Sequence, residues 1–281
     1  MSADRNKDIW DPLADSSEDK RRAERQPRTP QSASPSYRLA YADDDFLCRD
    51  ELRPVRLQLE LLKPEMILAE AGIRSTVVMF GGARIPEPGK APWAAKNETQ
   101  EKNLTAASRY YDEARAFARL CSTHSQETGG REFVVVTGGG PGVMEAGNRG
   151  AHDVGAKSIG LNVVLPHEQA PNAYVTPEFS LNFHDFAIRK MHFLMRAKAI
   201  TIFPGGFGTL DELFESLTLI QTQRMEHVPL ILFGSEFWHS IVNFQALAEF
   251  GTISPEDLDL IELVDTADEA WAIIARHYAL A

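Results

Sequence analysis

Cysteine is scarce in this sequence, with Cys48 and Cys121 the only two among 281 residues. They show neither CxxC spacing nor a nearby group of histidines, so a disulfide framework and a zinc site both lack support. The histidines are scattered without the spacing of metal ligands, and we expect no bound metal. These absences suit a protein of a reducing cytoplasm.

Positive charge and long apolar runs are also in short supply. The chain carries 29 basic against 40 acidic residues, a formal net charge of −11. Because each phosphate contact of a nucleic acid or an anionic membrane needs a cation, this balance argues against both as partners. No apolar run approaches the roughly 20 residues that span a bilayer, and residues 1–20 lack the apolar core of a secretory signal. We therefore expect a cytoplasmic protein whose anionic ligand, if any, is small and held by backbone amides.

Composition divides the chain into three parts. Residues 1–36 are charged, rich in Ser, Pro, Arg and Asp, and almost free of aliphatic clusters, which predicts a disordered tail. Residues 37–74 carry leucine-rich segments interrupted by Pro54 and Pro64, which predicts an extension of short helices. Residues 75–281 form the predicted main domain.

From residue 75 onward, short apolar runs alternate with amphipathic segments. The runs rich in Val and Ile predict strands at 76–80, 133–137, 158–164, 179–183, 199–203, 228–233 and 261–264. The segments between them predict helices at about 103–122, 141–154, 184–197, 209–223, 236–250 and 266–278. The runs lack the alternation of a one-sided sheet, as expected of parallel strands covered on both faces. The order predicts an α/β protein with a doubly wound, Rossmann-like, mostly parallel sheet after an N-terminal helical extension.

Three of the predicted strands end in glycine-rich loops. The loops are Gly81-Gly82, Gly138-Gly139-Gly140-Pro141-Gly142 and Pro204-Gly205-Gly206-Phe207-Gly208-Thr209. A parallel sheet binds its ligand at this carboxyl edge, and glycine lets a ligand approach the main-chain amides. We expect Pro141 in the first turn of one following helix and Thr209 at the N-cap of another.

These loops are candidates for phosphate binding, because a helix that starts directly after such a loop adds unpaired N–H groups. The predicted phosphate ligands are Gly81, Gly139, Gly140, Gly142, Gly205, Gly206, Gly208 and Thr209. For any single loop, a tight strand-to-helix turn explains the glycines equally well. Three such loops on one sheet edge favour the binding role.

Two familiar phosphate motifs fit poorly. A Walker loop needs a Gly-Lys-Ser/Thr ending, which none of the loops has. The dinucleotide fingerprint meets Val143 or Glu145 where its third glycine belongs, and the acidic ribose ligand roughly 20 positions later is missing. We therefore do not expect NAD.

Two charged residues lie beside the third glycine loop. Glu212 follows Thr209 by three positions, and Arg189 lies in the helix before the fifth predicted strand. The predicted buried stripe of the helix at 209–223 is Leu210, Leu213, Phe214, Leu217 and Ile220. Glu212 lies on another face, near the mouth of the loop. Thr209 and Glu212 also fit a capping box, so position alone leaves a catalytic and a capping role open.

With these residues in view, the sequence resembles a known family. The segment from Pro204 to Glu212 matches the pattern PGGxGTxxE, and with Arg189-Lys190 upstream it looks like the LOG family, long labelled lysine decarboxylase-like. The resemblance covers roughly residues 75–247. It implies a nucleotide-binding domain and a homodimer or larger assembly that needs no cofactor. The implied reaction cleaves the N-glycosidic bond of a nucleoside 5′-monophosphate, AMP-like or a cytokinin nucleotide, to free base and ribose 5-phosphate.

The resemblance also implies roles for single residues. The catalytic pair of the family corresponds to Arg189 and Glu212, which are 23 positions apart (212 − 189). Departure of the base leaves an oxocarbenium-like centre, which a carboxylate stabilises while it orients or deprotonates the attacking water. Arg189 would fix that carboxylate or hold the nucleotide. Lys190 is expected to bind nucleotide and Glu145 to contact the ribose, although an acid in a first helical turn is favourable without any ligand.

Some features separate this chain from short family members. Gly81-Gly82-Ala83-Arg84 replaces their Gly-Ser-Ser, about 70 residues precede the first strand, and the loop at 166–172 resembles longer bacterial members. Base specificity is therefore left open. A rival interpretation is a non-catalytic carrier of a nucleotide or of a molybdenum cofactor, although retention of both Arg189 and Glu212 favours an enzyme. The old decarboxylase label suggests pyridoxal phosphate as a cofactor, but no other feature of the sequence supports it.

Overall fold

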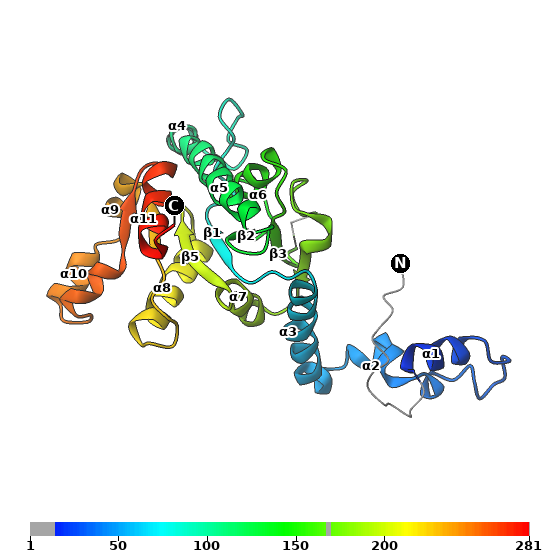
Figure 1. Cartoon of the computed structure of the whole chain (residues 1–281). Coiled ribbons are helices and arrows are strands. Elements are labelled where there is room, and N and C mark those ends of the chain that lie inside the picture. Colours follow the sequence, from blue (N-terminus) through cyan, green and yellow to red (C-terminus); the bar gives the residue numbers. More distant parts are fainter. Residues whose placement is uncertain (1–14, 167–169, 281) are drawn as a thin grey trace. The chain divides into compact units, whose positions relative to one another are not determined.

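The computed structural model describes residues 15–166 and 170–280, divided into two compact units between Leu59 and Glu60 (Figure 1). The first unit contains the helices α1 (Ser16–Glu24) and α2 (Asp44–Leu47), three short 3-10 helices and the start of α3 (Arg53–Glu70). Among its described residues only Asp43 is buried. This agrees with the shortage of aliphatic clusters in the sequence.

Helix α1 lies inside the segment that we expect to be disordered. Asp15 caps it by accepting a hydrogen bond from the backbone N–H of Ser17 (2.7 Å), and none of its residues is buried. Local interactions therefore account for this helix, and residues 1–14 of the predicted tail lie outside the described residues.

Helix α3 runs through Pro64, so the expected break at that residue is wrong. Proline lacks the N–H that would bond the carbonyl four residues earlier, which belongs to Glu60. That carbonyl instead accepts a hydrogen bond from Nε2 of His192 (3.1 Å). A side-chain donor thus replaces the missing helical bond, and Pro64 itself is buried.

The second unit is built on a seven-stranded sheet in which every pairing is parallel. The strands are β1 (Thr76–Phe80), β2 (Val134–Thr137), β3 (Ile159–Val163), β4 (Ser180–Phe183), β5 (Ala197–Ile202), β6 (Leu230–Phe233) and β7 (Glu262–Val264). All seven expected strands are present, with ends shifted by up to two residues. The α/β, doubly wound prediction is confirmed.

Helices connect these strands. They are α4 (Glu98–Ala107), α5 (Arg109–Glu127), α6 (Val143–Asp153), α7 (Phe186–Leu194), α8 (Phe207–Gln221), α9 (Ser235–Ile241), α10 (Phe244–Glu249) and α11 (Ala267–Tyr278). The single helix expected at 236–250 is two helices. Asn243 separates them, since its side chain accepts from the backbone N–H of Ala246 (3.0 Å) and caps α10.

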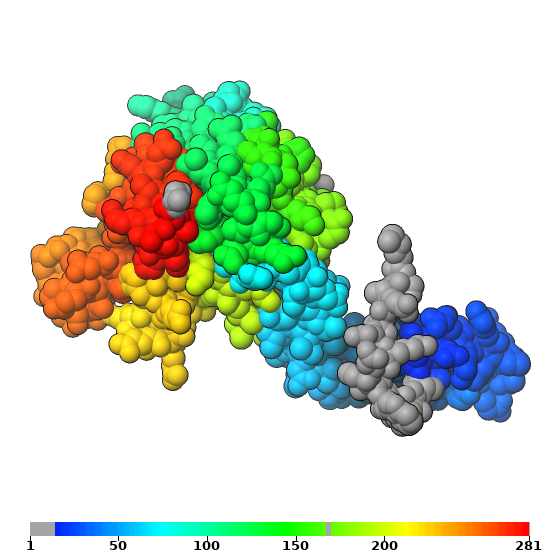
Figure 2. Space-filling model, in the orientation of Figure 1, coloured from blue at the N-terminus to red at the C-terminus, as the bar shows by residue number. Residues whose placement is uncertain are grey.

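Two hydrophobic cores lie on opposite faces of the sheet. One contains Leu68 of α3, Phe193 of α7 and Leu213 of α8, and the other contains Phe117 of α5 and Ile274 of α11. In Figure 2, α11 (red) lies on the surface beside α5 (green), with which it packs. Covered faces explain why the strands show no polar alternation.

The strand order β4-β3-β2-β1-β5-β6-β7 places the first strand at the centre of the sheet. The chain leaves β1 toward β2, β3 and β4, then crosses back to β5 on the other side of β1. The topological switch point therefore lies between β1 and β5, where such sheets bind ligands. The three strands followed by glycine loops, β2, β1 and β5, are adjacent at this point. No helix among the described residues is long and apolar enough to cross a membrane.

Candidate functional site

The three glycine loops meet at the carboxyl edge of the sheet. The backbone N–H of Gly82, after β1, donates to the carbonyl of Pro204, after β5 (3.0 Å), and the carbonyl of Gly82 accepts from Val143 N–H (3.3 Å). Gly142 has φ +69° and lies so close that a Cβ there would be 2.4 Å from the Gly82 oxygen. Glycine is therefore required for both conformation and contact at this position.

The second loop is held by side chains behind it. The Gly139 N–H donates to Oγ1 of Thr137 (2.9 Å), and Nδ2 of Asn172 donates to the carbonyls of Gly139 (3.1 Å) and Gly140 (3.0 Å). Asn172 also contacts Oδ1 of the buried Asn148 (2.9 Å). Because these two carbonyl oxygens accept hydrogen bonds from Asn172, they already have partners within the protein. No motif in the sequence marks Asn172 or Asn148 for this role.

Helix α8 starts earlier than expected. Its N-cap is Gly206 and its first residue Phe207, so the assignment of Thr209 as N-cap is wrong. A Cβ at residue 205 would lie 2.2 Å from Oγ1 of Thr209, so the absent side chain of Gly205 lets the helix begin early and bury Thr209. Glu212 then stands in the second turn, and the proposed capping box does not form.

The start of α8 is open. Gly206 and Gly208 are exposed, and a Cβ at either would meet no atom within 4 Å. The first-turn amides of a helix have no intrahelical partners, so here they are reachable by a ligand. Pro141, expected in the first turn of α6, instead lies before its N-cap Gly142. Gly81 has a packing role, since a Cβ there would lie 2.5 Å from a methyl group of Val143.

Arg189 is buried in α7 and points to the same edge. Its Nε donates to the carbonyl of Leu161 in β3 (2.7 Å), and its guanidinium carbon lies 5.2 Å from the centre of the Phe193 ring. A Cβ at Gly138 would be 2.7 Å from Nη2 of Arg189. The guanidinium therefore packs directly against the second glycine loop, and Gly138 makes room for it.

Glu212 is electrostatically coupled to Arg189. Burial disfavours its charged form and raises the pKa of Glu212 to about 8, while Arg189 and, more weakly, Lys190 act to lower it. Asp211 and Glu215 add to the rise because like charges oppose ionisation. A carboxyl group with this pKa exists in both protonation states near neutral pH, as acid–base chemistry requires.

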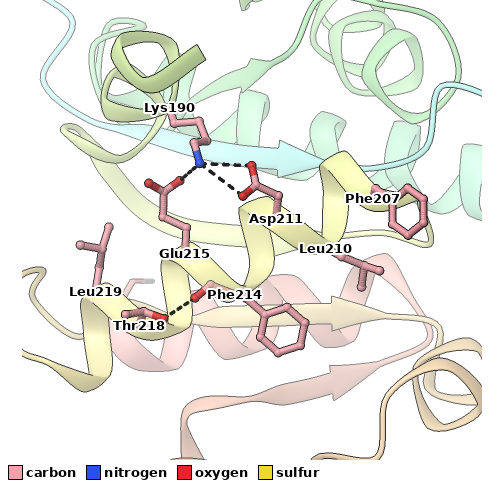
Figure 3. A pocket seen from close by; sticks show the side chains of 8 residues that line it. All are labelled: Lys190, Phe207, Leu210, Asp211, Phe214, Glu215, Thr218 and Leu219. Carbon is pink, nitrogen blue, oxygen red and sulfur yellow. Dashed lines mark hydrogen bonds and ion pairs between the residues drawn. The ribbon is translucent and has the colours of Figure 1, made fainter.

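Lys190 of α7 reaches across to two acids of α8. Its Nζ contacts Asp211 (3.1 Å) and Glu215 (2.9 Å), and these carboxylates outweigh the effect of burial and raise the pKa of Lys190 (Figure 3). The structure thus brings Lys190 to two acids of α8. Nucleotide binding by Lys190 stays a prediction.

A shallow groove of about 660 Å³ follows this side of α8. It is lined by Lys190, Phe207, Leu210, Asp211, Phe214, Glu215, Thr218 and Leu219 (Figure 3). Phe214 is 39% exposed, so its assignment to the buried stripe is wrong, whereas Leu213 and Ile220 are buried as expected.

Glu145 already has a partner in the protein. Its Oε1 accepts from the hydroxyl of Tyr111 (2.8 Å), which burial keeps protonated by raising the pKa of Tyr111. Arg149 donates to the same hydroxyl (3.3 Å) and to Glu87 (2.8 Å). The sequence analysis missed Tyr111, and ribose contact by Glu145 stays a prediction. No group of three or more His, Cys, Asp or Glu side chains suited to a metal occurs within residues 15–166 and 170–280.

Comparison with known proteins connects this geometry to a family. Residues 144–274 match the family model described as "Possible lysine decarboxylase". A cytokinin riboside 5′-monophosphate phosphoribohydrolase of Arabidopsis thaliana is 29% identical over 143 residues, which cover 50% of this chain and 65% of that protein. A probable enzyme of the same description from Oryza sativa subsp. japonica is 30% identical over 141 residues, 48% of this chain and 55% of that protein. The matches thus span less than two thirds of these relatives.

Solved structures with a similar course of the chain include molybdenum cofactor proteins. The molybdenum cofactor binding protein of Rippkaea orientalis superimposes with a TM-score of 0.46 and 16% identity, covering 73% of this chain and 98% of that one. The molybdenum cofactor carrier protein of Chlamydomonas reinhardtii gives a TM-score of 0.44, again with 16% identity, and coverages of 73% and 99%.

Proposed function

We propose that this chain, which is similar to members of the LOG family, is a nucleoside 5′-monophosphate phosphoribohydrolase. The proposed substrate is an AMP-like or cytokinin nucleotide, and the products are free base and ribose 5-phosphate. The observation that carries the proposal is the coupling of Glu212 to Arg189 beside the open start of α8. The relatives named for this activity support it at the level of the family.

The proposed reaction adds water across the N-glycosidic bond. The bond between C1′ and the base nitrogen breaks, the oxygen of water attaches to C1′, and the proton of water ends on the departing base. The ionised Glu212 carboxylate stabilises the positive charge that develops at C1′, accepts the proton of water and gives it up to the departing base, which returns Glu212 to its ionised form. Arg189 orients this carboxylate, and its contact with the second glycine loop fixes the two groups at one edge.

The phosphate of the substrate is proposed to bind at the glycine loops. The exposed amides around Gly206 and Gly208 begin a helix whose N-terminal partial charge favours an anion. The net charge of −11 does not oppose this, because the ligand is small and is held by neutral N–H groups. No nucleic acid or membrane partner and no cofactor enters the proposal.

The proposal includes assembly into a homodimer or larger homo-oligomer. Several apolar side chains of the second unit are exposed on α7 and α8: Phe186, Met191, Met195, Phe207 and Phe214. Apolar patches of this kind commonly mark protein interfaces.

Base release is the direct test. Purified protein is incubated with a panel of purine and pyrimidine nucleoside monophosphates, including cytokinin forms, and free base is separated and quantified. We expect release from at least one nucleotide, and Glu212→Gln and Arg189→Ala to lower kcat by about 100-fold or more. Glu249→Gln, an exposed acid of α10, is the matched control and should leave kcat unchanged.

The same experiment distinguishes an enzyme from a non-catalytic carrier. Tight nucleotide binding by calorimetry, with no base released from any member of the panel, would replace the enzyme with a nucleotide carrier. Release that persists in Glu212→Gln would remove Glu212 from the mechanism even if the activity itself stands.

A further inference from the structure

Helix α7, which carries Arg189, begins with two exposed residues. Arg189, His192 and Phe193 are buried, whereas Phe186 and Ala187 in the first turn are exposed. Apolar packing therefore anchors mainly the later part of this nine-residue helix, and in the first turn Ile188 is partly buried against the core. Polar interactions add to this single apolar contact in fixing the first turn.

Glu60 of α3 supplies those interactions. Its two carboxylate oxygens accept hydrogen bonds from the backbone N–H groups of His184 (2.9 Å) and Asp185 (3.0 Å), directly before α7. Asp185 in turn caps the helix by accepting from Ala187 N–H (3.0 Å). A negative charge near the N-terminus of α7 also interacts favourably with the helix dipole. The contact joins residues 124 and 125 positions apart in the sequence.

The other end of α7 is tied to the same part of α3. The Glu60 carbonyl, freed by Pro64, accepts from Nε2 of His192 (3.1 Å), and Glu65 pairs with Arg196 through both of its oxygens. The Arg196 pair lowers the pKa of Glu65 and keeps it ionised, against the effect of its partial burial. One face of α3, from Glu60 to Glu65, thus holds α7 before and after Arg189.

We propose that Glu60 is a positioning residue that sets the place of Arg189 relative to Glu212 by holding the first turn of α7. The inference rests on the proposed function for its kinetic part only. Glu60 binds the backbone directly before α7, so it acts on Arg189 through the helix. If the first turn is released, α7 can rock about Phe193, and the guanidinium shifts against Gly138 and Leu161.

The experiment compares three variants of the full-length chain. Glu60→Ala removes both acceptors, Glu60→Gln keeps one oxygen but turns an NH₂ group toward the other N–H, and Glu70→Ala removes an exposed acid of the same helix. We expect kcat for base release to fall by about 10- to 100-fold in Glu60→Ala with KM changed less than about threefold. Glu60→Gln should lie between, and Glu70→Ala should match the wild type.

A second readout does not depend on activity. Side-chain carboxyl carbons are observed by NMR in ¹³C-glutamate-labelled protein, with Glu212 assigned through Glu212→Gln, and are titrated with pH. Because Arg189 lowers the pKa of Glu212, its displacement in Glu60→Ala should move the Glu212 titration to higher pH. A purely structural role of Glu60 would lower the melting temperature and leave the Glu212 titration in the folded protein unchanged.

The outcomes separate the two proposals. A shifted Glu212 titration in a protein that releases no base would uphold the positioning role and overturn the enzymatic function. An unshifted titration with unchanged kcat in Glu60→Ala would overturn the positioning role. Should Glu60→Ala fail to fold, the milder Glu60→Gln is measured in the same way.

Discussion

The pKa of Glu212, raised to about 8 by burial, gives the proposed activity a pH dependence. If the ionised carboxylate assists water, kcat/KM should rise about tenfold per pH unit below the pKa and level off above it. The second ionisation of the substrate phosphate, near pH 6, lies clearly below this step. Rates of base release from about pH 6 to 10 measure the profile. A profile that falls through about pH 8 would instead assign Glu212 as a proton donor.

The same residue should reduce stability at neutral pH. The carboxyl group ionises near 4.5 ordinarily and near 8 in the folded protein. Between these values the unfolded chain binds fewer protons than the folded one, so the free energy of unfolding falls as pH rises. Glu212→Gln removes this loss, and we expect it to stabilise the protein by roughly 1–3 kcal/mol at pH 8.

Denaturant unfolding at several pH values tests this expectation. The gap between Glu212→Gln and the wild type should be smallest near pH 5 and grow toward pH 8. Glu249→Gln, at an exposed acid of α10, serves as control and should show no comparable growth. A constant gap would mean that the carboxyl group of Glu212 titrates normally in the folded state.

At the scale of elements, the second glycine loop depends on Asn172. This side chain donates to the carbonyls of Gly139 and Gly140, so Asn172→Ala leaves both without that donor. We expect the affinity for AMP or ribose 5-phosphate to fall about tenfold or more, because 1–3 kcal/mol of hydrogen bonding is lost. Calorimetry gives the affinity. Asn182→Ala, on an exposed position of β4, is the control, and equal affinities in both variants would contradict the role of Asn172.

The sequence predicted the elements well wherever local pattern determines them. Runs of Val and Ile covered on both faces gave all seven strands, and their order predicted the doubly wound sheet. The predicted start of α8 at Thr209 was wrong. Threonine favours the N-cap position, but the missing side chain of Gly205 leaves room for Thr209 inside the helix. The preference of threonine can be read from the sequence, whereas the packing against Gly205 cannot.

The sequence pointed to the glycine loops and the charged pair of the candidate site, and not to the side chains that hold them in place. Glycine loops and the Arg189–Glu212 pair have short motifs, whereas Asn172 reaches Gly139 across 33 residues and Glu60 reaches His184 across 124. A hydrogen bond from one side chain to a distant backbone group leaves no periodic trace in the sequence. Pro64 looked like a helix end because the Glu60 carbonyl, which Pro64 leaves without its helical donor, has its partner at His192, 132 positions away in the sequence.

At the scale of the whole molecule, the first unit is expected to be dispensable for folding of the second. Its described residues bury only Asp43, so removing them exposes little core. Deletion of residues 1–52 keeps α3 whole and should change the melting temperature by less than about 4 °C. Deletion of residues 1–70 also removes Glu60 and Glu65 and should lower both stability and base release. Equal losses in both deletions would contradict the proposed division of the chain.

The proposed assembly is tested on α8. Phe207 is 91% and Phe214 39% exposed, and burial of large aromatic side chains by a second copy would contribute strongly to association. We expect the wild type to be a dimer or larger by light scattering, and Phe207→Glu with Phe214→Glu to produce monomers. Phe250→Glu, at a phenylalanine that directly follows α10 and is 85% exposed, is the matched control. Because each copy carries a charge of −11, added salt should strengthen the association by screening repulsion, and a wild-type monomer at all salt concentrations would refute it.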